Sequence, residues 1–314
     1  MQSRPNNCRV SEKKSISKPY RLSIIITSLL LSIAILIGFS FTGFSGVSVA
    51  PLLLDLTMSP GSSGTGTLTV SNTGKEPIQI ESQVRGFRTS TRGVAHFLSE
   101  SAAEEYLYSG ENFLTLKPDK AVLEPLESKE FTYEVSYPNN PEPFGGRYVG
   151  ALFQSTPVEE KQDENGGSNI KVATRVGTLF LIRPSEEILV GDEFLEFEVK
   201  PEIKELTTSN VYGGDRLLIS THLKNSGNIH IRKKEFDATI SINGPSGELV
   251  EEIEISPHYI LPDTSYMLKE LWKIPGDIDD EELRKHTVKV RIGIKTPYGN
   301  IVEIEESRPV EIEI

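Results

Sequence analysis

Residues 70–80, VSNTGKEPIQI, have a counterpart in residues 223–231, LKNSGNIHI. In both copies a stretch of alternating apolar residues runs into an Asn-x-Gly turn, and two isoleucines at alternate positions follow it. Asn and Gly readily adopt the positive backbone φ angles that tight turns require. Two copies of one strand-turn-strand unit indicate an internal repeat, and therefore two domains of the same kind.

The sequence around both copies alternates between apolar and polar residues with a period of two, which is typical of half-buried strands. Clear examples are Gly66–Val70, Phe131–Val135 and Val288–Ile292. Each copy is followed by a Pro-marked corner, Leu123–Pro125 in the first and Leu261–Pro262 in the second, and closing strands come after it. Strands at this spacing predict an all-β protein with two tandem immunoglobulin-like β-sandwich domains.

The boundary between the two domains is predicted near residues 185–192, where the strand pattern is interrupted. Short helices are predicted only at 101–108 and 279–285. The predicted organisation is an N-terminal segment at 1–50, a first sandwich at 51–188 and a second sandwich at 189–314.

The N-terminal segment carries six basic residues and one acidic residue before position 22, and an almost unbroken apolar stretch follows at 22–41. Such a charge pattern keeps the first residues in the cytoplasm while the following chain is exported. About twenty helical residues span about 30 Å, the thickness of the hydrocarbon core of a bilayer. The segment is therefore predicted to be a hydrophobic helix, either a signal peptide cleaved after Ser48 or a retained membrane anchor. Both alternatives predict an extracytoplasmic protein, at the cell surface or anchored in the membrane, with its C-terminus outside.

The composition of the remaining chain excludes some classes of partner. Without residues 1–21 the chain has 27 Lys and Arg against 44 Asp and Glu, a net charge of −17. A body this acidic does not favour binding to nucleic acid. The only cysteine is Cys8, so the predicted domains contain no disulfide and depend on their hydrophobic cores.

The residues that could carry out catalysis or bind a metal form no recognisable motif. Only His222 and His230 are close among the five histidines, and two histidines without a third ligand make a poor zinc site. The acidic cluster at 277–282 lacks the alternating oxygen ligands and the bend glycine of a calcium loop. We therefore predict a protein that is not an enzyme and that uses no metal or cofactor.

Residues 52–184 contain four motifs that occur in order in one known family. The motifs are Leu68–Asn72, Thr89–Phe97, Ser109–Pro125 and, most specifically, the Pro- and Gly-rich bend that enters a strand at Pro143–Phe153. This region resembles the first, peptidoglycan-binding domain of the WxL-interacting cell-surface proteins, which have a pilus-chaperone-like immunoglobulin fold. The resemblance implies a cell-envelope binding module, with a second sandwich that contacts a partner.

The function expected from this resemblance is that of an exported, non-enzymatic scaffold that binds cell-wall glycan or an envelope protein. Tyr106, Tyr108 and Arg147 are the candidate ligand-binding residues, because exposed tyrosine rings can stack on sugars; tyrosines that cap the core are the alternative.

The alternative function is an assembly chaperone that adds a β-strand to a pilin-like subunit. Pilus chaperones grip a terminal carboxylate with basic residues on the first and last strands of the first domain. Lys171 and Arg175 could supply the latter, whereas residues 52–56 contain no basic residue.

Overall fold

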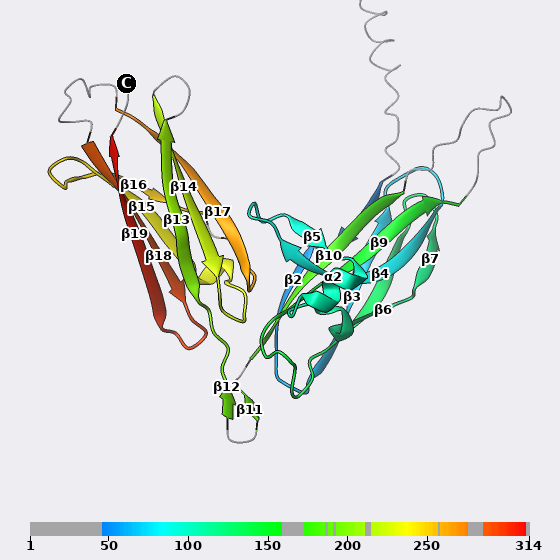
Figure 1. Ribbon diagram of the computed structural model, residues 1–314. Coiled ribbons are helices and arrows are strands. Elements are labelled where there is room, and N and C mark those ends of the chain that lie inside the picture. Colours follow the sequence, from blue (N-terminus) through cyan, green and yellow to red (C-terminus); the bar gives the residue numbers. More distant parts are fainter. Residues whose placement is uncertain are drawn as a thin grey trace, which may run out of the picture. The chain divides into compact units, whose positions relative to one another are not determined.

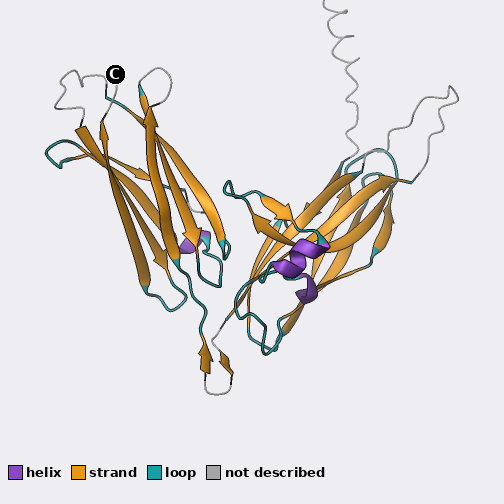
Figure 2. Cartoon of the chain, in the orientation of Figure 1, coloured by secondary structure: helices purple, strands orange, loops and turns teal. Residues whose placement is uncertain are grey.

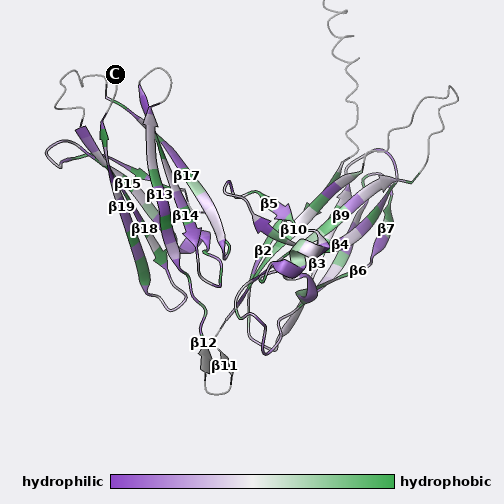
Figure 3. Cartoon of the chain, viewed as in Figure 1, coloured by the Kyte–Doolittle hydropathy of each residue, from purple (hydrophilic) through white to green (hydrophobic). Residues whose placement is uncertain are grey.

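The computed structural model describes residues 46–158, 173–185, 188–190, 193–210, 215–256, 258–275 and 285–311. These residues form two β-sandwiches with few helical turns (Figures 1 and 2). Hydrophobic and hydrophilic residues alternate along the strands, as the period-two pattern predicts (Figure 3). The prediction of an all-β fold with two immunoglobulin-like sandwiches is confirmed.

The first sandwich has two sheets. One sheet consists, in spatial order, of β1 (Val47–Ala50), β3 (Ser63–Asn72), β8 (Ser128–Ser136) and β6 (Leu114–Lys117). The other consists of β2 (Leu53–Met58), β10 (Thr174–Pro184), β9 (Arg147–Pro157), β4 (Ile78–Thr89) and β5 (Ala95–Phe97), with β7 (Lys120–Leu123) paired to β4. Between them lies a core that includes Leu68, Phe131, Phe153 and Phe180, which are all fully buried.

The first strand of this sandwich begins earlier than the predicted domain. Strand β1 pairs with β3, and its Val47 and Val49 are buried in the core. The predicted N-terminal segment at 1–50 therefore overlaps the sandwich by one short strand. A cut after Ser48 would fall inside β1. The predicted hydrophobic helix at 22–41 lies outside the described residues.

The second sandwich also has two sheets. One consists of β13 (Pro201–Asn210), β14 (Arg216–Asn225) and β17 (Thr264–Lys273), and the other of β16 (Leu249–Glu254), β15 (Phe236–Asn243), β18 (Lys285–Lys295) and β19 (Ile301–Glu311). A small hairpin of β11 (Ile188–Val190) and β12 (Glu193–Leu195) precedes them, in the region of the predicted boundary. Trp272 lies in the core with 1% of its surface exposed, and its indole N–H donates to Glu251.

The two Asn-x-Gly turns have the same structural role in the two sandwiches. The buried side-chain amide of Asn72 donates to three backbone carbonyls, and its oxygen accepts the N–H of Gly74. Asn225 is equally buried, donates to two backbone carbonyls and accepts the N–H of Gly227. Each asparagine therefore ties its turn to a neighbouring corner of the chain, and the repeat reflects one shared structural device.

The short helices are few. Helix α2 (Glu100–Glu105), capped by the hydroxyl of Ser99, forms where the sequence predicts one, and 3-10 turns occur at Glu111–Phe113 and Lys233–Glu235. The other predicted helix, at 279–285, falls almost entirely outside the described residues. Within the described ranges, no helix has the length and apolar character needed to cross a membrane.

Candidate functional site

A cluster of buried charged residues joins the two sandwiches. The guanidinium of Arg183, in β10, donates to both carboxylate oxygens of Glu235, at 3.0 and 2.9 Å. Both side chains are almost inaccessible, with 4% and 9% of their surface exposed. The geometry is bidentate, which is the strongest arrangement for this pair. Because the two residues belong to different sandwiches, their pairing connects the first domain to the second.

A second group of polar residues lies beside this pair. Asp55, in β2, accepts from the Nε and a terminal amino group of Arg232 at 2.9 and 2.7 Å. His230 is fully buried; its Nε2 lies 3.3 Å from the same Asp55 oxygen, and its Nδ1 lies 3.2 Å from the hydroxyl of Tyr148. We call Asp55, Arg232, His230 and Tyr148, together with the pair of Arg183 and Glu235, the junction network.

The junction network shifts the ionisation of its members. Burial alone would raise the pKa of Asp55, but the hydrogen bonds from His230 and Arg232 outweigh it and lower this pKa to about 2. Burial lowers the pKa of His230 below 6.5, although the hydrogen bond to Asp55 acts in the opposite direction, and the charges of Arg183 and Arg232 add to the lowering. The folded protein therefore favours a neutral imidazole beside an ionised carboxylate.

These shifts predict that acid destabilises the folded protein in two steps. As the pH falls below about 6.5, the unfolded chain protonates His230 before the folded chain does, so stability decreases. Between about 3.8 and about 2 the same happens at Asp55, whose folded pKa is the lower one. Urea unfolding midpoints measured across this pH range test the expectation. His230→Gln should reduce the first step, to which the lowered pKa of His258 also contributes, and keep the second. A wild-type midpoint that is constant from neutrality to pH 5 would contradict the expectation.

The loops that carry the network approach each other closely. Gly145 has a φ of +136°, and a side chain there would collide with the carbonyl oxygen of Asn228. The next residue, Gly146, donates its N–H to that same carbonyl at 2.7 Å. Glycines are therefore needed at this bend, because the loop of the second sandwich contacts it through the backbone.

A different feature, an open sheet edge, occurs in the first sandwich along the part of β10 that the outermost strand β2 does not cover. Strand β10 pairs with β9 from Thr174 to Ile182, but on its other side β2 pairs only with Leu179–Pro184. On that side no described strand is hydrogen-bonded to Thr174–Thr178, although β1 packs beside β10 and the Thr178 hydroxyl donates to the carbonyl of Pro51 at 2.6 Å. We call this opening the β10 slot.

The backbone groups that face the β10 slot follow from the alternation of a strand. The N–H of Leu179 donates to the carbonyl of Leu52, so it points away from β9. Arg175 and Gly177 have the same parity as Leu179, so their N–H and C=O groups point into the slot. Arg175 is exposed and its guanidinium bonds Gln154, whereas Val176 packs against the core.

The predicted ligand-binding residues lie together near the junction, but they are not exposed. Arg147 is 2% exposed, and its guanidinium donates to the carbonyls of the 143–146 bend and lies 4.9 Å above the ring of Phe113. Tyr106 and Tyr108 are half-buried and touch edge to face, and the Tyr106 hydroxyl donates to Pro262. Their role in ligand binding stays a prediction, and burial gives Arg147 a structural task at the bend.

The structure separates two residues that the sequence brought together. His222 lies in β14 opposite Met267, whereas His230 belongs to the junction network and is fully buried. The predicted basic residue Lys171 lies outside the described residues. Sequence reasoning missed Asp55 and Arg183, because charged residues in an alternating strand are assigned to the solvent face, and Glu235, because it lies in a short charged 3-10 turn.

No protein-family profile matches the chain, and no curated protein matches it. Solved structures with a similar fold do exist. One is the complex of the Salmonella enterica SafA pilin with the SafB chaperone, with 13% identity over 84% of this chain and 97% of that chain and a TM-score of 0.38. Others are the class 5 fimbriae chaperone CfaA, with 14% identity, coverage of 86% and 100% and a TM-score of 0.38, and the E. coli chaperone DraB, with 16% identity, coverage of 86% and 98% and a TM-score of 0.36.

These comparisons correct the main functional expectation from the sequence. The expected cell-envelope scaffold that binds peptidoglycan is wrong: the similar structures described above are fimbrial chaperones, alone or with a pilin, and none of them is a wall-binding protein. Cell-wall glycan therefore has no support as a partner. The resemblance of residues 52–184 to the WxL-interacting proteins stays a prediction.

Proposed function

We propose that this protein is an assembly chaperone that binds an incomplete β-sandwich subunit, of the pilin or adhesin class, by accepting one of its strands. The observation that carries the proposal is the β10 slot. A strand with unpaired N–H and C=O groups is a template for another strand, and protein chains use such edges for recognition by β-strand addition.

The β10 slot differs from the ordinary edges of the two sheets. It lies beside an inner strand, in line with β2, and it ends where Leu53 begins to pair with Leu179. A partner strand in the slot would therefore have a fixed end and a limited length of about five residues. Every second side chain of the partner strand would pack beside Val176 against the core, so a strand with apolar residues at alternate positions would fit the slot.

We further propose that the chaperone works outside the cytoplasm and performs no catalytic step. The support for this location is the basic segment followed by the apolar stretch at 22–41, together with a body that contains no cysteine. Retention of that stretch as a membrane anchor and its removal as a signal peptide remain the two alternatives.

Arg175→Pro tests the proposal directly. Proline at 175 removes the N–H that points into the slot and places its ring there, while the backbone hydrogen bonds between the neighbouring residues of β10 and β9 are kept. The probe is a synthetic eight-residue peptide of alternating valine and threonine, and its dissociation constant is measured with the full chain. We expect wild-type protein to bind it and the variant to bind at least roughly tenfold more weakly, since one lost hydrogen bond and a steric clash together cost more than about 1.4 kcal/mol.

Arg175→Ala is the matched control, because it removes the same side chain and keeps the N–H; its affinity should stay close to that of the wild type. Hydrogen exchange shows where the peptide binds: the backbone amides of Arg175 and Gly177 should exchange more slowly when the peptide occupies the slot. Equal binding by the proline variant, or protection at an edge such as β19 instead, would overturn the proposal.

A further inference from the structure

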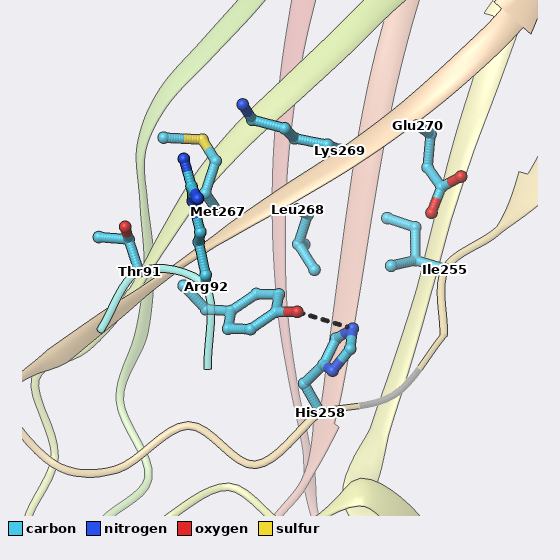
Figure 4. A pocket seen from close by; sticks show the side chains of 9 residues that line it. Thr91, Arg92, Ile255, His258, Met267, Leu268, Lys269 and Glu270 are labelled. Carbon is cyan, nitrogen blue, oxygen red and sulfur yellow. Dashed lines mark hydrogen bonds between the residues drawn. The ribbon is translucent and has the colours of Figure 1, made fainter. Parts of the chain in front are cut away.

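A groove with basic side chains lies at the junction of the two sandwiches. Its larger cavity, of about 560 Å³, is lined by Thr91 and Arg92 from the turn after β4, by His258, and by residues 266–270 of β17 (Figure 4). The Tyr266 hydroxyl lies 3.1 Å from the Nε2 of His258. In Figure 4 this hydrogen bond is the dashed line that ends at His258.

A smaller cavity of about 280 Å³ adjoins the first one, because both are lined by Arg92, His258 and Tyr266. The smaller cavity adds Lys233 and Tyr259 from the second sandwich. We call the two cavities together the junction groove. Contacts between the sandwiches fix its shape: the backbone N–H of Met267 donates to the carbonyl of Thr91 at 2.7 Å.

The junction groove is basic in an acidic protein. Its charged side chains are the exposed cations of Arg92, Lys233 and Lys269 and the single carboxylate of Glu270, with His258 between them. The chain beyond residue 21 carries 44 acidic against 27 basic residues, so the groove reverses the balance of its surroundings.

The cations of the groove are available to a ligand. In the described part of the chain, none of Arg92, Lys233 and Lys269 forms an ion pair, whereas Lys289 and Arg291 on β18 pair with acids of β19. The Lys233 ammonium lies 5.6 Å from the ring centre of Tyr259. Burial and the charge of Lys233 both lower the pKa of His258, which agrees with a positive potential in the groove.

The groove and the β10 slot meet. Leu53 and Leu179 form the first pair between β2 and β10, which closes the slot, and both residues also line the smaller cavity. A chain that leaves the slot at this end therefore lies next to the smaller cavity of the groove.

We infer that the junction groove binds an acidic stretch that flanks the added strand in the partner protein. This inference rests on the proposed function and names a further property of the partner. A strand in the β10 slot supplies most of the binding energy through the backbone, and the flanking acidic residues select the partner and its register by their charge.

The test compares two peptides with the full chain. Both have the alternating valine and threonine core; one carries three glutamates at each end and the other three glutamines. We expect the glutamate peptide to bind roughly tenfold more tightly at low salt, because several exposed ion pairs each contribute modestly. In about 0.5 M NaCl the advantage should shrink to about twofold, because salt screens exposed charges. Binding of the glutamate peptide should also raise the pKa of His258, read from its imidazole signals by NMR.

The variant that removes the groove charges carries Arg92→Gln, Lys233→Gln and Lys269→Gln. It should bind both peptides equally, with the affinity of the wild type for the glutamine peptide. The control carries Lys289→Gln and Arg291→Gln, which removes two exposed cations outside the groove, and it should keep the preference for glutamate.

The outcomes separate this inference from the proposed function. If the wild type binds both peptides equally, the groove does not select acidic residues and the inference is wrong, while the slot remains. If the preference survives in the groove variant, or inorganic phosphate abolishes it at equal ionic strength, the acidic stretch does not bind specifically in the groove. If neither peptide binds, the proposed function itself fails.

Discussion

Replacing Glu235 with alanine is expected to lower the free energy of unfolding by about 3–5 kcal/mol, because it leaves a buried charge without its partner. The guanidinium of Arg183 would keep only the carbonyl of His230, at 3.4 Å, and the backbone N–H of Arg232 would lose its acceptor as well. Water cannot replace these bonds easily, since the side chain of Arg183 is 4% exposed. Urea unfolding of the variant and the wild type measures the difference.

Two further variants show whether burial causes this loss. Glu305→Ala removes an exposed acid that lies 2.8 Å from Lys289, and it should cost no more than about 1 kcal/mol. The double variant Arg183→Met, Glu235→Leu removes both buried charges and should recover most of the stability, because no unpaired ion remains. A loss below about 1 kcal/mol for Glu235→Ala would show that Arg183 finds another partner, and the junction network would then not hold the domains together.

The sequence was sufficient to predict the sandwiches, because local alternation and turn chemistry specify strands. Residues 66–70 and 131–135 lie in paired strands of one sheet, and the repeated Asn-x-Gly turns lie at equivalent positions. Trp272 alternates with the apolar Ile274 in the sequence, and it is buried in the core. In each case the decisive residues are close together in the sequence, so their pattern can be read directly.

The candidate site could not be predicted in the same way. Asp55 and Arg232 are 177 positions apart, and their contact exists only after both domains have folded and met. Arg147 and Arg183 read as solvent-facing residues, and they are buried because loops and the second sandwich cover that face of β9 and β10. The junction groove combines a turn of one domain with a strand of the other, which no local pattern reveals.

Replacing Asn225 with leucine is expected to destabilise the second sandwich by about 3 kcal/mol or more, since each buried polar group left without a partner costs about 1–3 kcal/mol. Its amide donates to the carbonyls of Ile229 and Ile260 at 2.8 and 3.1 Å, and its oxygen accepts the N–H of Gly227 at 3.1 Å. Leucine has the same number of side-chain heavy atoms as asparagine, but it supplies none of these bonds. Asn243→Ala is the control; the described structure shows no hydrogen bond of that side chain, so the change should stay within about 0.5 kcal/mol.

The equivalent position in the first sandwich makes the prediction sharper. Asn72→Leu breaks bonds to the carbonyls of Glu76, Leu123 and Glu124, so it should cost as much as the change at Asn225 but unfold the other domain first. Asn225→Asp keeps an acceptor for the N–H of Gly227 but places a carboxylate against the carbonyls of Ile229 and Ile260. If the bonds that Asn225 donates to these carbonyls contribute most of the stability, the aspartate variant should be no more stable than the leucine variant. If aspartate instead restores the stability, the bond from the turn N–H to the asparagine oxygen contributes more than the bonds from the asparagine amide to the neighbouring corner.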